Sequence, residues 1–217
     1  MVETATGVVL RTRLLTETSL IVHWLTPNLG RIATVAKGAR RPKSPFRGKL
    51  DLFYVADFSF TRSRTSELHN LREMNLRETY PFLRQDINYL QQAAYCVRLI
   101  EMATETEAPL GQIFNLIQGF LGALPAQHCR PHLVVAFEIK LLGELGLQPD
   151  LARTELTDGA KSLVRHLEKA DWLAIPRLRL DSPQQRELRR FLHGFLLFHL
   201  GRIPKGREAA LDCGAAE

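Results

Sequence analysis

The apolar residues of this chain change their spacing near residue 80, and this change limits the folds that the chain can adopt. Before it, short runs rich in β-branched and aromatic residues are separated by turn residues such as Pro27 and Gly30. After it, apolar residues recur at the three- and four-residue spacing of helices. The pattern predicts an α+β protein with a strand-rich domain at residues 1–80 and a helical domain at residues 81–217.

The first domain is predicted to be a small closed β-barrel. Several short strands joined by turn signals within about 80 residues are typical of such barrels. The expected strands cover residues 7–15, 20–25, 31–36, 50–61 and 66–76.

The second domain is predicted to be a helical bundle. Pro131 suits the first turn of a helix and Gly146 suits its end. The last helix has a capping pattern at its start, with Ser182 as the cap and Pro183 in the first position. Residues from Lys205 onward are small and polar and are expected to fray. The expected helices cover residues 82–104, 110–124, 131–145, 157–167 and 182–200.

All of the excess positive charge lies in the first domain. Residues 1–80 hold 13 Lys or Arg against 7 Asp or Glu, and the remainder holds 16 of each, so the net charge of +6 belongs to the first domain. Residues 31–49, which we call the basic segment, contain no acidic residue and are broken into turns by Gly and Pro. The seven cations of the basic segment are Arg31, Lys37, Arg40, Arg41, Lys43, Arg47 and Lys49.

The basic segment predicts a surface that binds nucleic acid, because each cation that neutralises a phosphate releases counterions. Phe46 within it, and Trp24 and Tyr54 on neighbouring strands, could stack on bases. Trp24 and Phe46 could equally belong to the barrel core. Arg62 and Arg64 add positive charge at a second predicted hairpin. A run of cations that is merely solvated is the alternative interpretation.

Catalytic and metal-binding motifs are missing from the sequence. It contains no GxxxxGK[ST] and no GxGxxG, so it does not predict bound ATP or NAD. His128, Cys129 and His132 are close together, but Pro131 interrupts them and no second cluster completes a zinc site. We therefore expect no enzyme activity, no metal and no cofactor. The three scattered cysteines and the absence of a signal-like or membrane-spanning segment favour the cytoplasm.

Several motifs resemble one known family. They are TETS at residues 16–19, LTPNLGR at 25–31, VAKGARRPKS at 35–44, LLGELGLQPDL at 141–151 and LGRIPKGRE at 200–208. On these motifs the chain resembles the RecO family of bacterial recombination mediators over most of its length. The AKGAR block within the basic segment is the most specific part of the resemblance.

The resemblance implies an N-terminal five-stranded OB-fold barrel followed by an all-helical domain. It also implies a protein without nucleotide hydrolysis that binds single- and double-stranded DNA and anneals complementary strands. The implied partners are RecR, the C-terminal tail of single-strand-binding protein (SSB) and RecF, with RecA loaded onto SSB-coated DNA in the nucleoid. The implied DNA contacts are Lys37, Arg40, Arg41, Lys43, Arg47 and Lys49.

The chain departs from the family pattern in one respect. Many members carry a four-cysteine zinc site after the LGLxPDL segment, whereas here the sequence continues ARTELTDGAKS without a cysteine. Zinc is therefore not expected. No local motif marks the residues that would contact RecR or the SSB tail.

The residues alone are also compatible with two other functional classes. A general OB protein that binds single-stranded RNA or DNA is one, because charge alone does not distinguish the two nucleic acids. A protein-interaction adaptor is the other, in which the neutral helical domain is the active part and the basic segment is incidental.

Overall fold

The computed structural model describes residues 1–126, 131–178 and 181–212. The chain divides into two compact units. The first unit contains Met1–Pro81 and Thr104–Asn115, and the second contains Phe82–Ala103 and Leu116–Glu217. A short segment beyond the expected boundary therefore belongs to the same unit as the strands.

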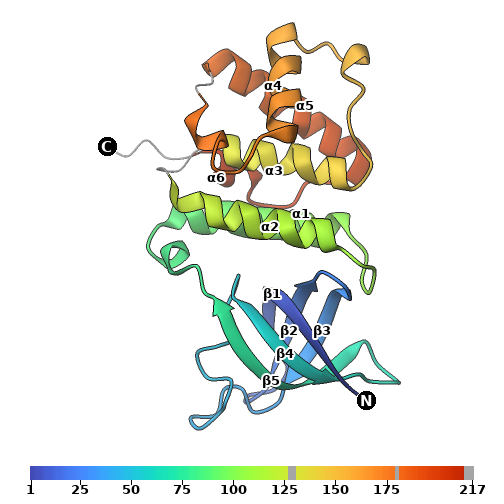
Figure 1. Cartoon of the computed structure of the whole chain (residues 1–217), viewed down its shortest axis with the longest axis vertical. Coiled ribbons are helices and arrows are strands. Elements are labelled where there is room, and N and C mark those ends of the chain that lie inside the picture. Colours follow the sequence, from blue (N-terminus) through green and yellow to red (C-terminus); the bar gives the residue numbers. More distant parts are fainter. Residues whose placement is uncertain (127–130, 179–180, 213–217) are drawn as a thin grey trace. The chain divides into compact units, whose positions relative to one another are not determined.

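The strands of the first unit form a closed barrel (Figure 1). Neighbouring strands follow the order β1-β2-β3-β5-β4, and β4 closes the barrel on β1. The β3–β5 pair is parallel and the other neighbouring pairs are antiparallel. This is the five-stranded OB-fold, so the predicted fold class is confirmed. The strands are β1 (Val2–Leu14), β2 (Leu20–Thr26), β3 (Gly30–Ala36), β4 (Val55–Thr61) and β5 (Leu68–Glu78).

The fourth strand begins at Val55, five residues later than the sequence predicts. The chain before it turns sharply, because Phe53 adopts a left-handed backbone with φ 67°. The Phe53 N–H donates to the Val9 carbonyl at 2.8 Å, and the Val9 N–H donates to the Tyr54 carbonyl at 2.9 Å. These bonds fasten the end of the β3–β4 connection to β1 beside the β1 bulge.

Trp24, for which the sequence left both base stacking and core packing open, lies in the barrel core. Trp24 is 0% exposed, and its ring stacks on Phe58 with centroids 4.2 Å apart. Its indole N–H donates to the Thr34 hydroxyl at 2.9 Å, which satisfies the one polar atom of the ring inside the core. Trp24 therefore stabilises the barrel and is not available to stack on a base.

The LTPNLGR motif forms a turn that the segment Thr104–Asn115 contacts through its backbone. The Glu107 N–H donates to the Arg31 carbonyl at 3.1 Å, and the Leu110 N–H donates to the Pro27 carbonyl at 3.0 Å. Gly30 has a φ of 66°, and a Cβ placed on it would lie 1.9 Å from the Ala108 carbonyl oxygen. Only glycine fits this position, because it supplies both the backbone conformation and the space.

The second unit is helical (Figure 1). The third expected helix begins at Pro131 as predicted, and Gly146, with φ 70°, follows its end. The last long helix covers the expected residues, but Asp181 rather than Ser182 caps it and accepts the Gln184 N–H at 2.7 Å. The helices are α1 (Ile87–Ala103), α2 (Gly111–Ala123), α3 (Pro131–Glu144), α4 (Asp158–Lys169), α5 (Ser182–Leu200) and α6 (Arg207–Leu211).

The sequence did not predict α6. Residues from Lys205 onward were expected to fray, but Arg207, Ala210 and Leu211 are buried. The Arg207 guanidinium pairs with Glu138 of α3, and the Gln92 side-chain amide of α1 donates to the Ala210 carbonyl at 3.1 Å. The expectation is therefore wrong for the described part of this segment, because one charged residue and two apolar residues anchor it in the second unit.

Candidate nucleic-acid interface

The connection between β3 and β4, residues 37–54, contains most of the basic segment, and we call it the basic loop. It is built from successive tight turns in which a backbone N–H donates to the carbonyl three residues earlier. The bonds are Arg41 to Gly38 at 3.0 Å, Ser44 to Arg41 at 3.0 Å, Arg47 to Ser44 at 3.2 Å and Lys49 to Phe46 at 3.1 Å. The loop therefore has a defined backbone along its whole basic part.

Two apolar residues fasten the basic loop to the barrel. Ala39 is 6% exposed and Phe46 is 7% exposed, and both belong to the same core cluster as Trp24. Tyr54 packs against this cluster and is partly buried. Of the two roles that the sequence left open for Phe46, its burial supports the core role, because its ring lies in the core and holds the loop in place.

The six cations of the basic loop are wholly or partly accessible to solvent. Lys37, Arg40, Arg41, Lys43 and Arg47 are exposed, and Lys49 is half-buried. Within the described parts of the chain, no acidic side chain forms an ion pair with any of these six. Their positive charge is therefore not neutralised by the protein, as a surface for phosphates requires.

The basic loop is also fastened to the β1–β2 turn, residues 15–19. The Gly38 N–H donates to the Ser19 hydroxyl at 3.2 Å, and the Arg40 N–H donates to the Thr18 carbonyl at 3.0 Å. The Arg40 guanidinium donates to the Glu17 carbonyl at 2.9 Å. In OB-fold proteins the β1–β2 loop borders the face that binds oligonucleotides, so the loop lies beside the surface that this fold uses.

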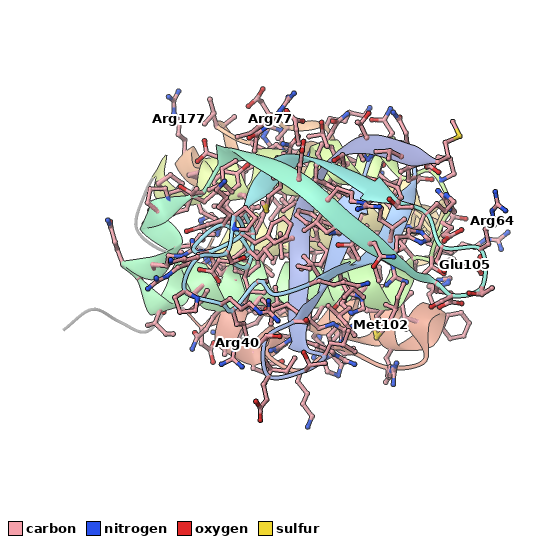
Figure 2. All side chains as sticks on the ribbon, turned by 90° about the horizontal axis from the view of Figure 1, so that it is seen from below. Arg40, Arg64, Arg77, Met102, Glu105 and Arg177 are labelled. Carbon is pink, nitrogen blue, oxygen red and sulfur yellow. The ribbon has the colours of Figure 1, made fainter. Side chains whose placement is uncertain are left out.

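Three predicted site residues lie outside this surface. The Arg31 guanidinium, on β3, donates to the Thr104 carbonyl at 2.5 Å and is half-buried. Arg62 binds Glu3 through two hydrogen bonds, at 2.8 and 3.2 Å, and lies 3.5 Å from a Glu107 oxygen. Arg64 is exposed in the β4–β5 loop, and Figure 2 shows it far from Arg40 in that view.

The Arg62 pair has a measurable consequence. The hydrogen bond from Arg62 holds the pKa of Glu3 below its ordinary value, so this charge is already matched by a carboxylate. We expect Arg62→Gln to leave the salt dependence of DNA binding unchanged, whereas Arg41→Gln removes about one phosphate contact. Fluorescence anisotropy with a labelled single strand over a salt series compares the two variants. A shallower slope for Arg62→Gln would show that Arg62 releases Glu3 and binds DNA.

Two arginines that the sequence analysis did not select lie on the outer face of the barrel. Arg11 and Arg13 are two residues apart on β1, and this spacing places them on one face of a strand. Arg11 pairs across the ladder with His23 of β2. Burial, together with the positive charges of Arg11, Arg13 and Arg31, lowers the pKa of His23 to about 4. The alternation of Arg11 and Arg13 was the available signal for this second positive region.

The depressed pKa of His23 predicts loss of stability in acid. In the unfolded chain His23 takes up a proton below about pH 6.5, but the folded state resists protonation until about pH 4. Stability is therefore complete above pH 6.5 and decreases as the pH falls toward 4. We expect His23→Gln to reduce this decrease, measured as the difference in urea midpoint between about pH 7.5 and pH 5. Part of the decrease should remain, because burial also lowers the pKa of His69. An identical pH dependence in wild type and variant would show that His23 does not contribute to the loss of stability in acid.

Across residues 1–126, 131–178 and 181–212, no group of three or more His, Cys, Asp or Glu side chains is placed to hold a metal ion. His128, Cys129 and Cys213 lie outside the described residues. In those same ranges no helix is both long and apolar enough to span a bilayer.

Comparison with known proteins gives matches on both units. Residues 1–80 match the family described as "Recombination protein O N terminal", and residues 84–158 match "Recombination protein O C terminal". Proteins named "DNA repair protein RecO" are similar in sequence. The one from Rhodopirellula baltica is 32% identical over 147 residues, covering 68% of this chain. The one from Alkaliphilus metalliredigens is 33% identical over 146 residues, covering 67% of this chain.

The matches extend over different shares of the relatives. The aligned region covers 54% of the Rhodopirellula protein and 58% of the Alkaliphilus protein, so this chain spans somewhat more than half of their length. The protein of the same name from Anaeromyxobacter dehalogenans is 28% identical, and the alignment covers 91% of both chains.

Proposed function

This chain belongs to the RecO family, and on that premise we propose that it acts in DNA repair as a recombination mediator. In this role it binds single- and double-stranded DNA and anneals complementary strands. The observation that carries the proposal is the basic loop, whose cations have no acidic partner in the described structure.

The physical basis of annealing follows from this surface. Two DNA strands repel each other through their phosphates, and a cationic surface that binds both offsets that repulsion and raises their local concentration. Trp24 and Phe46 are buried, so neither ring holds a base by stacking. Strands bound through their phosphates keep their base edges free to pair. No nucleotide hydrolysis is required by such a mechanism.

The proposed partners come from the family rather than from a described contact. We propose that, with RecR, this protein helps to load RecA onto DNA coated by SSB, and that it contacts the SSB C-terminal tail. RecF is a further proposed partner. The residues that meet these proteins are not assigned.

The experiment that tests the proposal is annealing of complementary oligonucleotides that are first coated with SSB. The protein is expected to accelerate duplex formation without any nucleotide, and the effect is measured with and without RecR by loss of donor fluorescence. The proposal would be overturned if the protein binds each single strand but annealing stays at the uncatalysed rate both with and without RecR.

One observation supports a second candidate, a general OB protein for single-stranded RNA or DNA. The exposed groups of the basic loop are cations, and phosphates are common to both nucleic acids. Competition between DNA and RNA strands of one sequence separates the two functions. A preference for DNA favours the mediator, and equal competition together with absence of annealing favours the general binder.

A further inference from the structure

A hollow of about 400 Å³ lies between the β1–β2 turn and the basic loop. A space of this size falls within the range of small-molecule sites. Its walls are held together by the hydrogen bonds that join Gly38 to Ser19 and Arg40 to Thr18. The hollow is therefore a fixed feature of this end of the barrel and not a gap between two loose loops.

Some of the residues that line the hollow suit a phosphate. Lys37 and Arg41 line it, and both are exposed cations without an ion pair to any described acid. The Arg41 side chain lies over Gly38, since a Cβ added there would be 3.4 Å from its Cδ atom. The Thr16 hydroxyl oxygen accepts the backbone N–H groups of Thr18 and Ser19, at 3.4 and 3.1 Å, so its own proton remains available to donate.

Apolar side chains also line the hollow. Leu15 lines the hollow with 45% of its surface exposed, and the adjacent Leu14 is 66% exposed. Val35 of β3, which is buried, also lines the hollow. Large aliphatic side chains exposed next to a cluster of cations are typical of a contact surface. This hollow thus combines cationic and apolar side chains within the dimensions of one small ligand.

We propose that the hollow binds one nucleotide of a DNA strand, with its phosphate on Lys37, Arg41 and Thr16 and its base against Leu15. The inference rests on the proposed function and adds the place where a base touches the protein. An aliphatic contact tolerates any base, and it is weaker than stacking on an aromatic ring. Such a contact orders a strand and still releases the base to a complementary one.

The test compares two ligands and two protein variants. The ligands are a thymidine oligonucleotide and a strand of the same length made of abasic sites, which keeps the phosphates and lacks the bases. Leu15→Ser is expected to weaken binding of the thymidine strand about fivefold, since it removes a half-exposed leucine contact, and to leave binding of the abasic strand unchanged. The matched control is Leu76→Ser, which replaces a leucine that is 37% exposed on β5 outside the hollow.

The outcomes separate this inference from the proposed function. Equal weakening of both ligands by Leu15→Ser, or equal effects of Leu15→Ser and Leu76→Ser, would overturn the nucleotide site while DNA binding itself stands. Wild-type protein that binds neither ligand at low salt would overturn the proposed function as well. Arg41→Gln removes one phosphate contact, so it should affect both ligands alike. The slope of log K against log salt should become shallower by about 0.7 for each. Thermal unfolding of each variant confirms that it is folded.

Discussion

Replacing Arg40, Arg41 and Lys43 together with glutamine is expected to weaken binding of single-stranded DNA by about 500-fold at about 50 mM salt. All three side chains are exposed on the ordered basic loop, and none is neutralised by an acid in the described structure. Each lost phosphate contact on a single strand makes the slope of log K against log salt shallower by about 0.7. The triple variant should therefore have a slope shallower by about 2, measured by anisotropy over a salt series.

The matched control removes the same charge from other positions of the barrel. Arg62 and Arg77 pair with Glu3 and Asp57, and Arg72 donates to the Thr61 hydroxyl at 2.8 Å. Replacing these three with glutamine lowers the net charge equally but should leave most of the affinity and the salt slope in place. Equal losses in the two triple variants would mean that net charge, and not the basic loop, governs binding.

The second large effect is expected in the second unit, at a buried ion pair between α3 and α6. Arg207 donates to both carboxylate oxygens of Glu138, at 2.7 and 2.9 Å, and the two side chains are 4% and 0% exposed. The Tyr95 hydroxyl donates to the same carboxylate at 2.5 Å, and burial together with this carboxylate raises the pKa of Tyr95. We expect Glu138→Ala to lower the free energy of unfolding by about 3–5 kcal/mol, because it leaves a guanidinium charge buried without its partner.

A double variant tests whether the cost arises from the unpaired charge. Replacing Glu138 with leucine and Arg207 with methionine removes both charges and keeps apolar volume, so it should recover much of the stability that either single change loses. Urea unfolding followed by circular dichroism measures wild type, Glu138→Leu, Arg207→Met and the double variant. A double variant that is less stable than both single variants would show that packing, rather than the unpaired charge, sets the loss.

The change of hydrophobic spacing near residue 80 was sufficient to predict the two kinds of architecture. It works because side chains on one face of a strand recur every two residues, whereas those on one face of a helix recur every three or four. The β3–β4 connection was harder to predict. Phe46 lies among prolines and cations with no periodic pattern, and its burial depends on the path by which the loop returns to the barrel. Sequence reasoning therefore left both roles open for Phe46, and the core role is the correct one.

The candidate site was predicted in part, for a reason that individual residues show. Lys37, Arg40 and Arg41 are exposed because the turns of this connection, which contains Gly and Pro, keep their charged side chains outside the barrel core. Arg62 looked equivalent from its neighbours, but its partner Glu3 is 59 residues away along the chain. Such a pairing depends on strand register between β1 and β4, which local patterns do not reveal.

The C-terminal motif is a second case in which a contact distant in sequence decides the role of a residue. Residues 205–211 look like a polar tail, yet Arg207 completes the ion pair with Glu138, 69 residues earlier. Gly206, with φ 98°, starts the short helix that presents Arg207. The motif LGRIPKGRE at this position resembles the family. The structural role of its Arg207 could be seen only from the packing of α6 on α1 and α3.

The salt dependence of single-stranded DNA binding tests the central claim most directly, because its slope counts the cations that neutralise phosphates. If the six cations of the basic loop all contact DNA, wild-type protein should give a slope of about −4. Affinity that changes little with salt, with a slope shallower than about −1, would contradict the claim that the basic loop forms the DNA-binding surface.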